Sequence, residues 1–598
     1  MTIAPLKKIT LVGLAADKDK LVKDLQSLGA VHLIPLRTPE QEEVLEGALD
    51  VLEAKKALSY LSDCPIPRRP VKKDRSFDAH DCVAQTLAIK QQLEDLEDQK
   101  RFLVKRISDV EPWGDIHFPP LEALRGERLW FYRLPLSARP SLADVALPWS
   151  IVQQDSRYLY VAVVSRDEPA VDAMPIARTH VGARSLTQLH HDLEKVELDI
   201  EELDARRVGM TRYALLLGNS IAAVEDKAER LSVGLRLLED GHVVGLQGWA
   251  PEDRADDVKT LARDLGLALR IEAPSKDDKI PTLIEHEGLM KAGAALANFY
   301  SVPPYGSVDP SAAILFSFTL FFGLIVADLG YGLLMLIGLG FFWRKLGASE
   351  GGRVARQVMV LLSGTTMAVG LLVGSLFGVA PEAGSLRASV QLFDLQNFDQ
   401  MMALSIFIGL AHLMLANAMR AAAAPNLSRA SEPIAWMAMF AGGAVLWQGW
   451  SNPVAFGLMA SAALIILLFA GETKPTGLRT TAIRAVEGVK GLLGMMSAFG
   501  DALSYMRLFA LALAGASLAA TFNTLAADVR DAYPGLGLLA ALLILLIGHG
   551  LNLTLALMSG VVHGLRLNFI EFYNWSLSGS GERFRAIRKR EIKTWTPS

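Results

Sequence analysis

Charge is distributed very unevenly along this chain of 598 residues, and no other feature of the sequence limits its fold more. Residues 1–300 carry 40 Lys/Arg and 49 Asp/Glu, whereas residues 301–598 carry only 20 and 15. Long apolar segments with few charges are typical of helices that cross a bilayer. We therefore expect a soluble first half joined to a membrane-embedded second half, and not one globular enzyme.

Several function classes find no support in the sequence. Neither half carries the basic stripe that is typical of nucleic-acid binding, so we expect no nucleic-acid partner. The two cysteines, Cys64 and Cys82, show neither a disulfide framework nor metal-ligand spacing with histidines. No phosphate-binding loop, dinucleotide fingerprint or hydrolase signature is present. We expect a chain that is not an enzyme, with no catalytic residues, no metal and no cofactor.

The first half, residues 1–300, is predicted to be a cytoplasmic α+β domain in which two small α/β lobes are carried on a long two-helix coiled coil. Strand and helix patterns place the lobe segments at about 1–80, 120–180 and 240–280. The N-terminal apolar run breaks before a signal-peptide core can form, which places this half in the cytoplasm. The basic linker IPRRPVKKDR, residues 66–75, is expected to be solvated.

Two heptad-like seams predict the coiled coil. Apolar residues recur at steps of three and four over 89–110, with Lys100 as the one polar member, and again from Leu186 to Leu238. We expect helices over about 82–112 and 185–239. The second helix would be roughly 80 Å long, which favours a scaffold that holds something at a distance.

The second half, residues 301–598, is predicted to be a membrane helical bundle of eight transmembrane helices with a long, tilted last pair. The expected spans are about 311–327, 331–344, 357–380, 401–420, 433–449, 453–470, 493–526 and 535–575. Asp328, Gly330 and Gly332 supply turn chemistry that predicts a hairpin between the first two spans. With both termini cytoplasmic, the basic residues after position 300 fall on the cytoplasmic side, apart from Arg387, Arg507, Arg530 and Arg566.

Two of these arginines, Arg507 and Arg566, lie inside predicted spans, where a charge is costly and usually faces a pathway or a partner. Small residues follow Arg507 at helical spacing and form a face that another helix can approach closely: Ala510, Ala514, Ser517 and Thr521. Polar residues on the last span form a stripe beside which a hydrated path could run: His549, Asn552, Ser559, His563 and Arg566. Ser504 and Glu571 are further half-channel candidates.

Plainer interpretations stay open for some of these residues. Small faces usually serve ordinary helix packing, and Arg566 can extend to the cytoplasmic interface. Glu571 and Asp501 lie near the cytoplasmic ends of their spans, where they can simply be solvated.

The last two spans hold no carboxylate at depth, so an ion carrier is expected to come from another chain. A positive charge beside a carboxylate favours its ionised form, whereas hydrocarbon favours its protonated form. A carboxylate that arrives at Arg507 would release its proton and collect another beyond it. The fixed charge would also block leakage between the entry and exit paths.

Several separate motifs resemble one family, the large membrane subunit, called a or I, of vacuolar-type and archaeal-type rotary ATPases. SYMRLFALALAGA, 504–516, is similar to its arginine-bearing seventh span, and VVHGLRLNFIEF, 561–572, to its eighth. FFGLIVADLGYGLLM, 321–335, is similar to the first hairpin and GSLFG, 374–378, to the third span. Gly248-Trp249-x-Pro251 and Pro303-x-Tyr305-x-x-x-Asp309-Pro310 also match. The resemblance covers nearly the whole chain.

The resemblance implies a stator whose Arg507 faces the glutamate of the rotor c-ring, with a proton half-channel on either side and ATP hydrolysed by other subunits. It also implies that the soluble rod binds peripheral-stalk subunits of the E/G type, and the chain length suggests a prokaryotic plasma membrane. Two positions depart from the eukaryotic pattern. Gly515 stands where eukaryotic members carry a histidine, and Ala556 where they carry an acidic residue, so the half-channels are expected to be lined differently here.

The main alternative is a stand-alone secondary transporter or channel with a cytoplasmic regulatory domain. It predicts inverted repeats, broken helices and an internal carrier carboxylate, of which the sequence offers only the broken first span. A coiled-coil signalling receptor would need fewer spans and no buried arginine.

Overall fold

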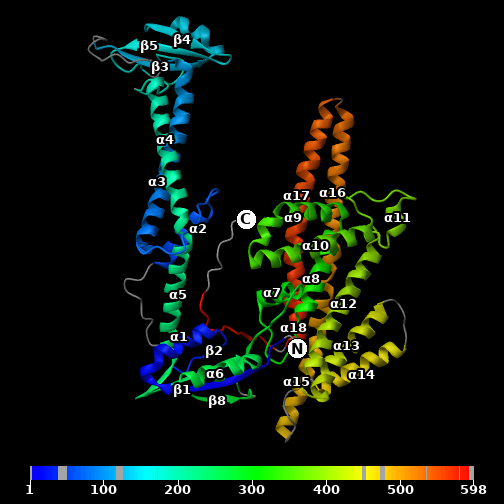
Figure 1. The fold of residues 1–598 in the computed structure, drawn as a ribbon. Helices are drawn as coiled ribbons and strands as arrows, with labels where there is room; N and C mark the ends of the chain where they lie inside the picture. Colours follow the sequence, from blue (N-terminus) through cyan, green and yellow to red (C-terminus); the bar gives the residue numbers. More distant parts are fainter. Residues whose placement is uncertain are drawn as a thin grey trace. The chain divides into compact units, whose positions relative to one another are not determined.

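The computed structural model of the chain describes residues 3–37, 50–115, 126–170, 173–182, 184–275, 278–447, 453–469, 471, 478–533, 535–577 and 579–590. It divides into two compact units. The first unit comprises Met1–Thr38 and Arg236–Arg588, and the second comprises Pro39–Leu235 and Lys589–Pro597. The first contains an N-terminal sheet and the apolar helices, and the second contains long charged helices and a smaller sheet (Figure 1).

The sheet of the first unit joins segments that lie far apart in the sequence. Its antiparallel strand order is β2-β7-β1-β8, and β6 also pairs with β7. Gly248 permits the close approach of β2, because a side chain there would collide with the backbone of His32. The elements are β1 Leu6–Leu14, α1 Lys18–Leu28, β2 His32–Ile34, β6 Leu238–Asp240, β7 Val243–Pro251, α6 Ala255–Asp264 and β8 Ala268–Glu272. The first and third predicted lobe segments therefore share one sheet.

The second unit is organised around helices that pack through their apolar faces. Buried Leu103, Ile107 and Val110 on α3 contact Leu189 and Val196 on α4, so the two helices run antiparallel. Lys100, the polar member of the seam, forms an ion pair with Glu197 at 2.7 Å. The helices are α2 Val51–Ser62, α3 Ala79–Val110, α4 Leu186–Met210 and α5 Ala214–Arg236.

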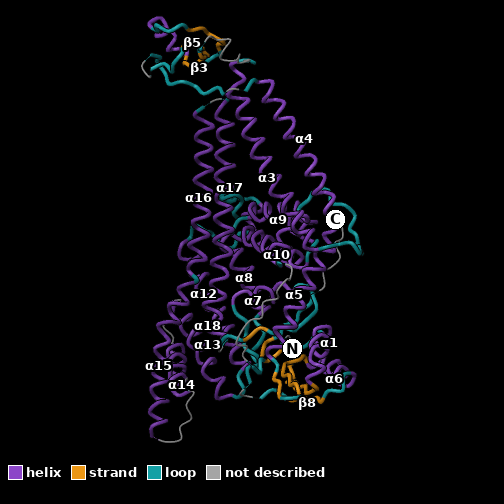
Figure 2. The backbone as a smooth tube through the Cα atoms, turned by 90° about the vertical axis from the view of Figure 1, so that its left-hand side faces the viewer, coloured by secondary structure: helices purple, strands orange, loops and turns teal. Residues whose placement is uncertain are grey.

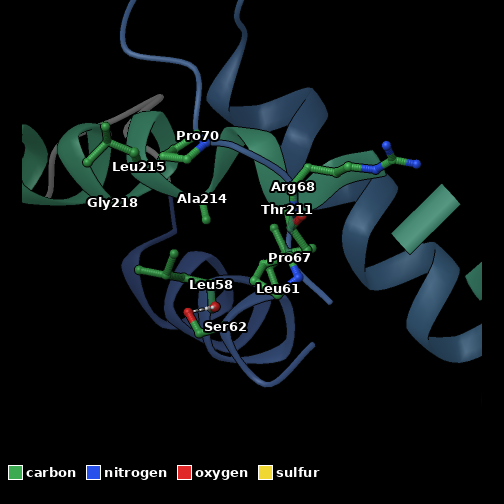
Figure 3. Close-up of a pocket in the computed structure, with 10 residues that line it drawn as sticks. All are labelled: Leu58, Leu61, Ser62, Pro67, Arg68, Pro70, Thr211, Ala214, Leu215 and Gly218. Carbon is green, nitrogen blue, oxygen red and sulfur yellow. Dashed lines mark hydrogen bonds between the residues drawn. The ribbon is translucent and has the colours of Figure 1, made fainter. Parts of the chain in front are cut away.

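The sequence pattern predicts one continuous helix for the second seam, and this is wrong. A 3-10 turn at Thr211–Tyr213 separates α4 from α5. The basic linker docks at this turn: the backbone N–H of Arg68 donates to Thr211 Oγ1 at 2.8 Å, and that of Val71 donates to the Arg212 carbonyl at 2.9 Å. Figure 3 shows the resulting hollow, with Pro67 and Pro70 beside α5 and Leu58 of α2 facing them. The seam also ends early, because residues 238–240 form β6.

The outer lobe of the second unit is a three-stranded antiparallel sheet of order β3-β5-β4, formed by β3 Arg128–Pro135, β4 Trp149–Gln154 and β5 Tyr158–Ser165. In the described part of this lobe, residues 126–182, the helical segment is the 3-10 helix Leu136–Asp144.

Burial raises the pKa of the Cys82 thiol on α3 to about 11, so this cysteine is not a reactive thiolate.

Apolar helices make up most of the first unit. They are α7 Met290–Tyr300, α8 Ser311–Val326, α9 Leu329–Gly347, α10 Glu350–Val373, α11 Leu386–Val390, α12 Phe398–Ala423, α13 Leu427–Trp447, α14 Pro453–Phe469, α15 Leu478–Ser504, α16 Met506–Ala532, α17 Leu536–Arg566 and α18 Tyr573–Ser576. Among the described residues, five helical stretches are long and apolar enough to cross a membrane: 329–347, 350–373, 398–423, 482–532 and 536–576. Two shorter apolar helices are α8 and α14. The end of the predicted span 433–449 lies outside the described residues.

The predicted hairpin at Asp328 is wrong. Helices α8 and α9 both pack against α10 and not against each other. The residue with left-handed backbone geometry is Ala327, at φ 43°, and not Gly330 or Gly332. These glycines lie inside the first turn of α9, where side chains would collide with Phe377 and with α10 respectively. They serve close packing and not a turn.

Helices α16 and α17 form the long pair predicted at the end of the chain. They pack side by side and extend past the ends of α9 and α10 in both views (Figures 1 and 2). The predicted third span runs too far, because α10 ends at Val373 and residues 374–378 form a loop in which Gly374, Phe377 and Gly378 have positive φ.

The C-terminal segment ties the sheet lobe of the first unit to the helices. Strand β10, Glu582–Arg583, pairs in parallel with β9, Pro281–Thr282. The Gly581 N–H donates to the Val302 carbonyl at 2.7 Å, and the Ile587 N–H donates to the Val31 carbonyl at 2.9 Å.

Candidate functional site: two polar clusters on one helix pair

Arg507 lies in the first turn of α16, next to the break that separates α15 from α16. Tyr505 occupies the break; it is fully buried, and its hydroxyl lies 2.8 Å from Nδ1 of His412 on α12. A side chain at Gly409 would collide with the Tyr505 ring, so this glycine lets the ring pack directly on α12. The span predicted over 493–526 lies within one apolar stretch, 482–532, that is interrupted at this residue, and the anchored ring fixes where Arg507 stands.

Five of the predicted residues come together around Arg507 and form what we call the near cluster: Ser504, Arg507, His563, Arg566 and Glu571. Arg566 Nε lies 4.0 Å from Glu571 Oε1, and Ser504, whose hydroxyl donates to the Gly500 carbonyl at 3.1 Å, lies close to Glu571. The charges of Arg566 and Glu571 act on Arg507, and both arginines act on His563. Two positive charges thus face one carboxylate and one imidazole.

The hydrogen bonds within the near cluster do not satisfy all of its buried polar atoms. Arg507 Nη1, His563 Nδ1 and Glu571 Oε2 are buried and have no hydrogen-bond partner among the described residues. Each such group costs about 1–3 kcal/mol if nothing satisfies it, and more when it is charged. Unsatisfied polar atoms that gather in one place indicate a site that water, an ion or another chain completes.

Glu571 is 2 % exposed, so the expectation that it is simply solvated near the end of its span is wrong. It lies in a π-helical segment, Leu567–Phe572, that continues α17. π-helical turns occur often at functional sites. Fully buried Asn568 holds this segment in place, because its amide donates to the Gly564 carbonyl at 2.9 Å and it accepts from Ser317 at 2.5 Å.

A second set of polar residues, the far cluster, lies further along α16 and α17, where they meet the start of α9. Its members are Asp328, Tyr331, Asn523, His549 and Asn552. Asn552 donates at 2.9 Å to the Tyr331 hydroxyl, which lies 2.8 Å from His549 Nδ1. His549 Nε2 in turn lies 3.0 Å from Asn523 Oδ1. If Tyr331 donates to His549, one donor direction runs through the whole set, and His549 is neutral with its proton on Nε2.

The far cluster is tied to backbone at both ends. Asn552 donates to the Gly515 carbonyl on α16 at 2.9 Å, and Asn523 donates to the Phe377 carbonyl at 2.8 Å. Gly515 is one of the two positions that depart from the eukaryotic pattern, and here its backbone oxygen holds Asn552. The side chain that reaches this point comes from α17 and not from α16.

Asp328 is 4 % exposed and clamps the loop after α10 onto the start of α9. Its Oδ1 accepts from the backbone N–H of Tyr331 and of Phe377, both at 3.0 Å. Its Oδ2 accepts from the Ser375 hydroxyl at 2.6 Å and from the Gly378 N–H at 2.9 Å. Four donors on one carboxylate make Asp328 a structural clamp that orients Tyr331 and Phe377.

The small face of α16 is not covered by any of the described segments. Its members are exposed, and their small side chains leave a smooth surface beside Arg507: Ala510, Ala514, Ser517 and Thr521. The Thr521 hydroxyl is satisfied by the Ser517 carbonyl at 2.8 Å. Ser559 is partly buried on α17, between the two clusters in the sequence.

Sequence reasoning missed Tyr331, Asn523, Asn568 and the pair Tyr505 and His412. A signal was available, because each is a polar residue inside an apolar stretch. Among the described residues no group of three or more His, Cys, Asp or Glu could hold a metal ion.

Comparison with known proteins tests the resemblance to rotary ATPase membrane subunits. No protein-family model matches the chain. V-type ATP synthase subunit I of Chlamydia pneumoniae is 26 % identical over 86 % of this chain and 87 % of its own length. V-type ATP synthase subunit I 1 of Treponema pallidum is 25 % identical over 98 % of this chain and 100 % of its own length. These relatives, each 23–27 % identical to this chain, support its place in the V/A-type ATPase subunit a/I family.

The likeness extends to archaeal proteins. A-type ATP synthase subunit I of Methanocaldococcus jannaschii is 27 % identical over 58 % of this chain and 56 % of its own length. Together with the five apolar helices, these relatives identify a multi-pass membrane protein.

Proposed function

We propose that this chain is the stator subunit of a V/A-type rotary ATPase, in which it forms two proton half-channels beside a ring of c subunits. The relatives are named as subunits of ATP synthases, which supports a place in a rotary ATPase complex. The observation that carries the finer assignment is the near cluster. There a guanidinium nitrogen of Arg507 has no hydrogen-bond partner in the described part of the chain, and the face of small residues beside it is exposed.

In the proposed mechanism a carboxylate on the rotor moves along the small face of α16 and meets Arg507. The positive charge favours the ionised carboxylate, so the proton leaves, and the apolar surroundings beyond Arg507 favour reprotonation. The arginine also blocks a continuous proton path between the two sides. This chain supplies charge and geometry, and ATP is bound and hydrolysed by other subunits.

The two clusters serve as the two proton paths in this proposal. The near cluster, with His563, Arg566 and Glu571 at the end of α17, opens to the cytoplasm. The far cluster, with His549 and Asn552, opens to the opposite side. We place both termini in the cytoplasm of a prokaryote, with the chain in the plasma membrane, and count eight spans, because that arrangement puts the basic loops inside.

The second unit fits the role of a cytoplasmic arm. Its antiparallel helices α3 and α4 bury a seam of apolar residues, which supports the proposed coiled coil. We propose that this arm binds peripheral-stalk subunits of the E/G type and so keeps the stator from turning with the ring.

The test is ATP-driven acidification of membrane vesicles that carry the whole complex, with Arg507→Ala compared with the native chain. We expect the variant to assemble and to lose proton pumping by at least 100-fold, because no other residue on α16 supplies the charge at that position. Arg530→Ala is the matched control, since Arg530 is exposed on the same helix and pairs with Asp531.

Normal pumping by an assembled Arg507→Ala complex would exclude the ion-path role. If no ATPase subunit co-purified with the native chain and the chain alone moved ions, the stand-alone transporter would be correct.

A further inference from the structure

A cavity of about 370 Å³ lies in the first unit where the ends of α12, α13, α14 and α15 meet the loop before α8. It is separate from both clusters on α16 and α17. Three arginines from three different helices line it, Arg420, Arg429 and Arg484, and the acidic residue among its described lining is Glu432. Volumes of this size are typical of sites for small molecules.

The arginines keep donors available. Arg420 Nη2 lies 3.4 Å from Glu432, which is longer than a strong charge-assisted hydrogen bond. Arg484 donates to the Leu468 carbonyl through Nε and Nη2, which leaves Nη1 unused in this contact. Arg429 is exposed, and its side chain forms no hydrogen bond or ion pair among the described residues. The lining therefore has a net positive charge, and some of its guanidinium N–H groups are available to donate hydrogen bonds to a ligand.

A second observation is independent of the charges. Ser576, the last residue of α18, lines the same cavity, is 6 % exposed, and its hydroxyl has no hydrogen-bond partner among the described residues. A buried hydroxyl left unpaired in a polar cavity indicates a bound group that satisfies it. The hydroxyl can donate to an anionic oxygen, as the three guanidinium groups can.

We infer that this cavity binds a phosphate group. Guanidinium groups bind phosphate oxygens in pairs of parallel hydrogen bonds, and three arginines around one cavity match such an anion better than a carboxylate or a cation. The four helix ends fall on the predicted cytoplasmic face, where basic pockets between spans take the headgroups of anionic lipids. The phosphate source is therefore a phospholipid, with inorganic phosphate as the other source of the same chemistry.

The test uses the full-length chain in its assembled complex and measures the fraction of spin-labelled phosphatidylglycerol held immobile by the protein. Spin-labelled phosphatidylcholine is the reference lipid, and inorganic phosphate is added as a competitor. We expect Arg429→Gln to weaken phosphatidylglycerol binding about tenfold, because one charge-assisted interaction is lost. Ser576→Ala should weaken it about threefold.

Arg344→Gln is the matched control, because Arg344 is an exposed arginine on the same predicted face but outside the cavity. Loss of phosphatidylglycerol in Arg429→Gln alone supports a lipid site, and displacement by inorganic phosphate supports the same site with free phosphate as its ligand. Equal losses in Arg429→Gln and Arg344→Gln, or no loss in Arg429→Gln and Ser576→Ala, would overturn the inference. Arg429 bears no structural bond, so its variant should fold normally.

Discussion

The near and far clusters both border α16 and α17, but they differ in how completely their hydrogen bonds are satisfied. In the far cluster each polar side chain has a partner, and the set is fixed to backbone at Gly515 and Phe377. In the near cluster Arg507, His563 and Glu571 each have a buried atom that finds no partner among the residues the structure describes. A satisfied network orders its own surroundings, whereas an unsatisfied one depends on something outside the chain.

The clearest contrast is between two buried carboxylates. Asp328 in the far cluster accepts four hydrogen bonds, and Glu571 in the near cluster has an oxygen with none among the described residues. The first should therefore matter for stability and the second for ion movement, although both are almost fully buried.

Asp328→Asn should have the largest effect on stability. Its new amide group would point N–H donors at the N–H and hydroxyl donors that now bind a carboxylate oxygen, at a cost of about 3 kcal/mol. The measurement is the midpoint of thermal unfolding of the purified chain in detergent, which should fall clearly. Asp531→Asn, at the exposed end of α16, is the control and should leave the midpoint in place. An unchanged midpoint in Asp328→Asn would mean that the clamp is not structural.

Tyr331→Phe should have the next largest effect. The substitution keeps the ring, which packs edge-on against Phe377 and His549, and removes the hydroxyl that joins Asn552 to His549. Asn552, which is buried, and His549, which is partly buried, each lose a partner, so the free energy of unfolding should fall by about 2 kcal/mol. Tyr533→Phe is the comparison, because Tyr533 is exposed. If both variants unfold at the native temperature, the far cluster is not a closed network.

Helical spacing alone predicts which of these residues share a face of a helix, but not how their hydrogen bonds are satisfied. Steps of three and four placed Arg507 on the small face and put His549, Asn552, His563 and Arg566 on one stripe, since residues at that spacing share a face of a helix. Exposure of the small face agrees with that placement. Local periodicity sufficed because α16 and α17 are regular over these residues.

Features that depend on contacts between distant segments could not be predicted. The break at Tyr505 depends on His412 and Gly409 on α12, and the role of Asp328 depends on a loop about 50 residues later. Turn residues at 328–332 suggested a hairpin, because Asp and Gly have the same local signature at a turn and at a close helix contact. Contacts between residues so far apart in the chain do not affect the local periodicity of the sequence.

Glu571→Gln should have the smallest effect on stability and still impair pumping. Glutamine keeps the shape of the side chain and removes a buried charge, which lies 4.0 Å from Nε of Arg566. The free energy of unfolding should therefore change by less than about 1 kcal/mol. ATP-driven acidification of vesicles should nevertheless fall, because the exchangeable carboxyl proton is gone. A loss of stability as large as that of Asp328→Asn, with pumping intact in the folded fraction, would show that both carboxylates are structural and that the two clusters do not differ in kind.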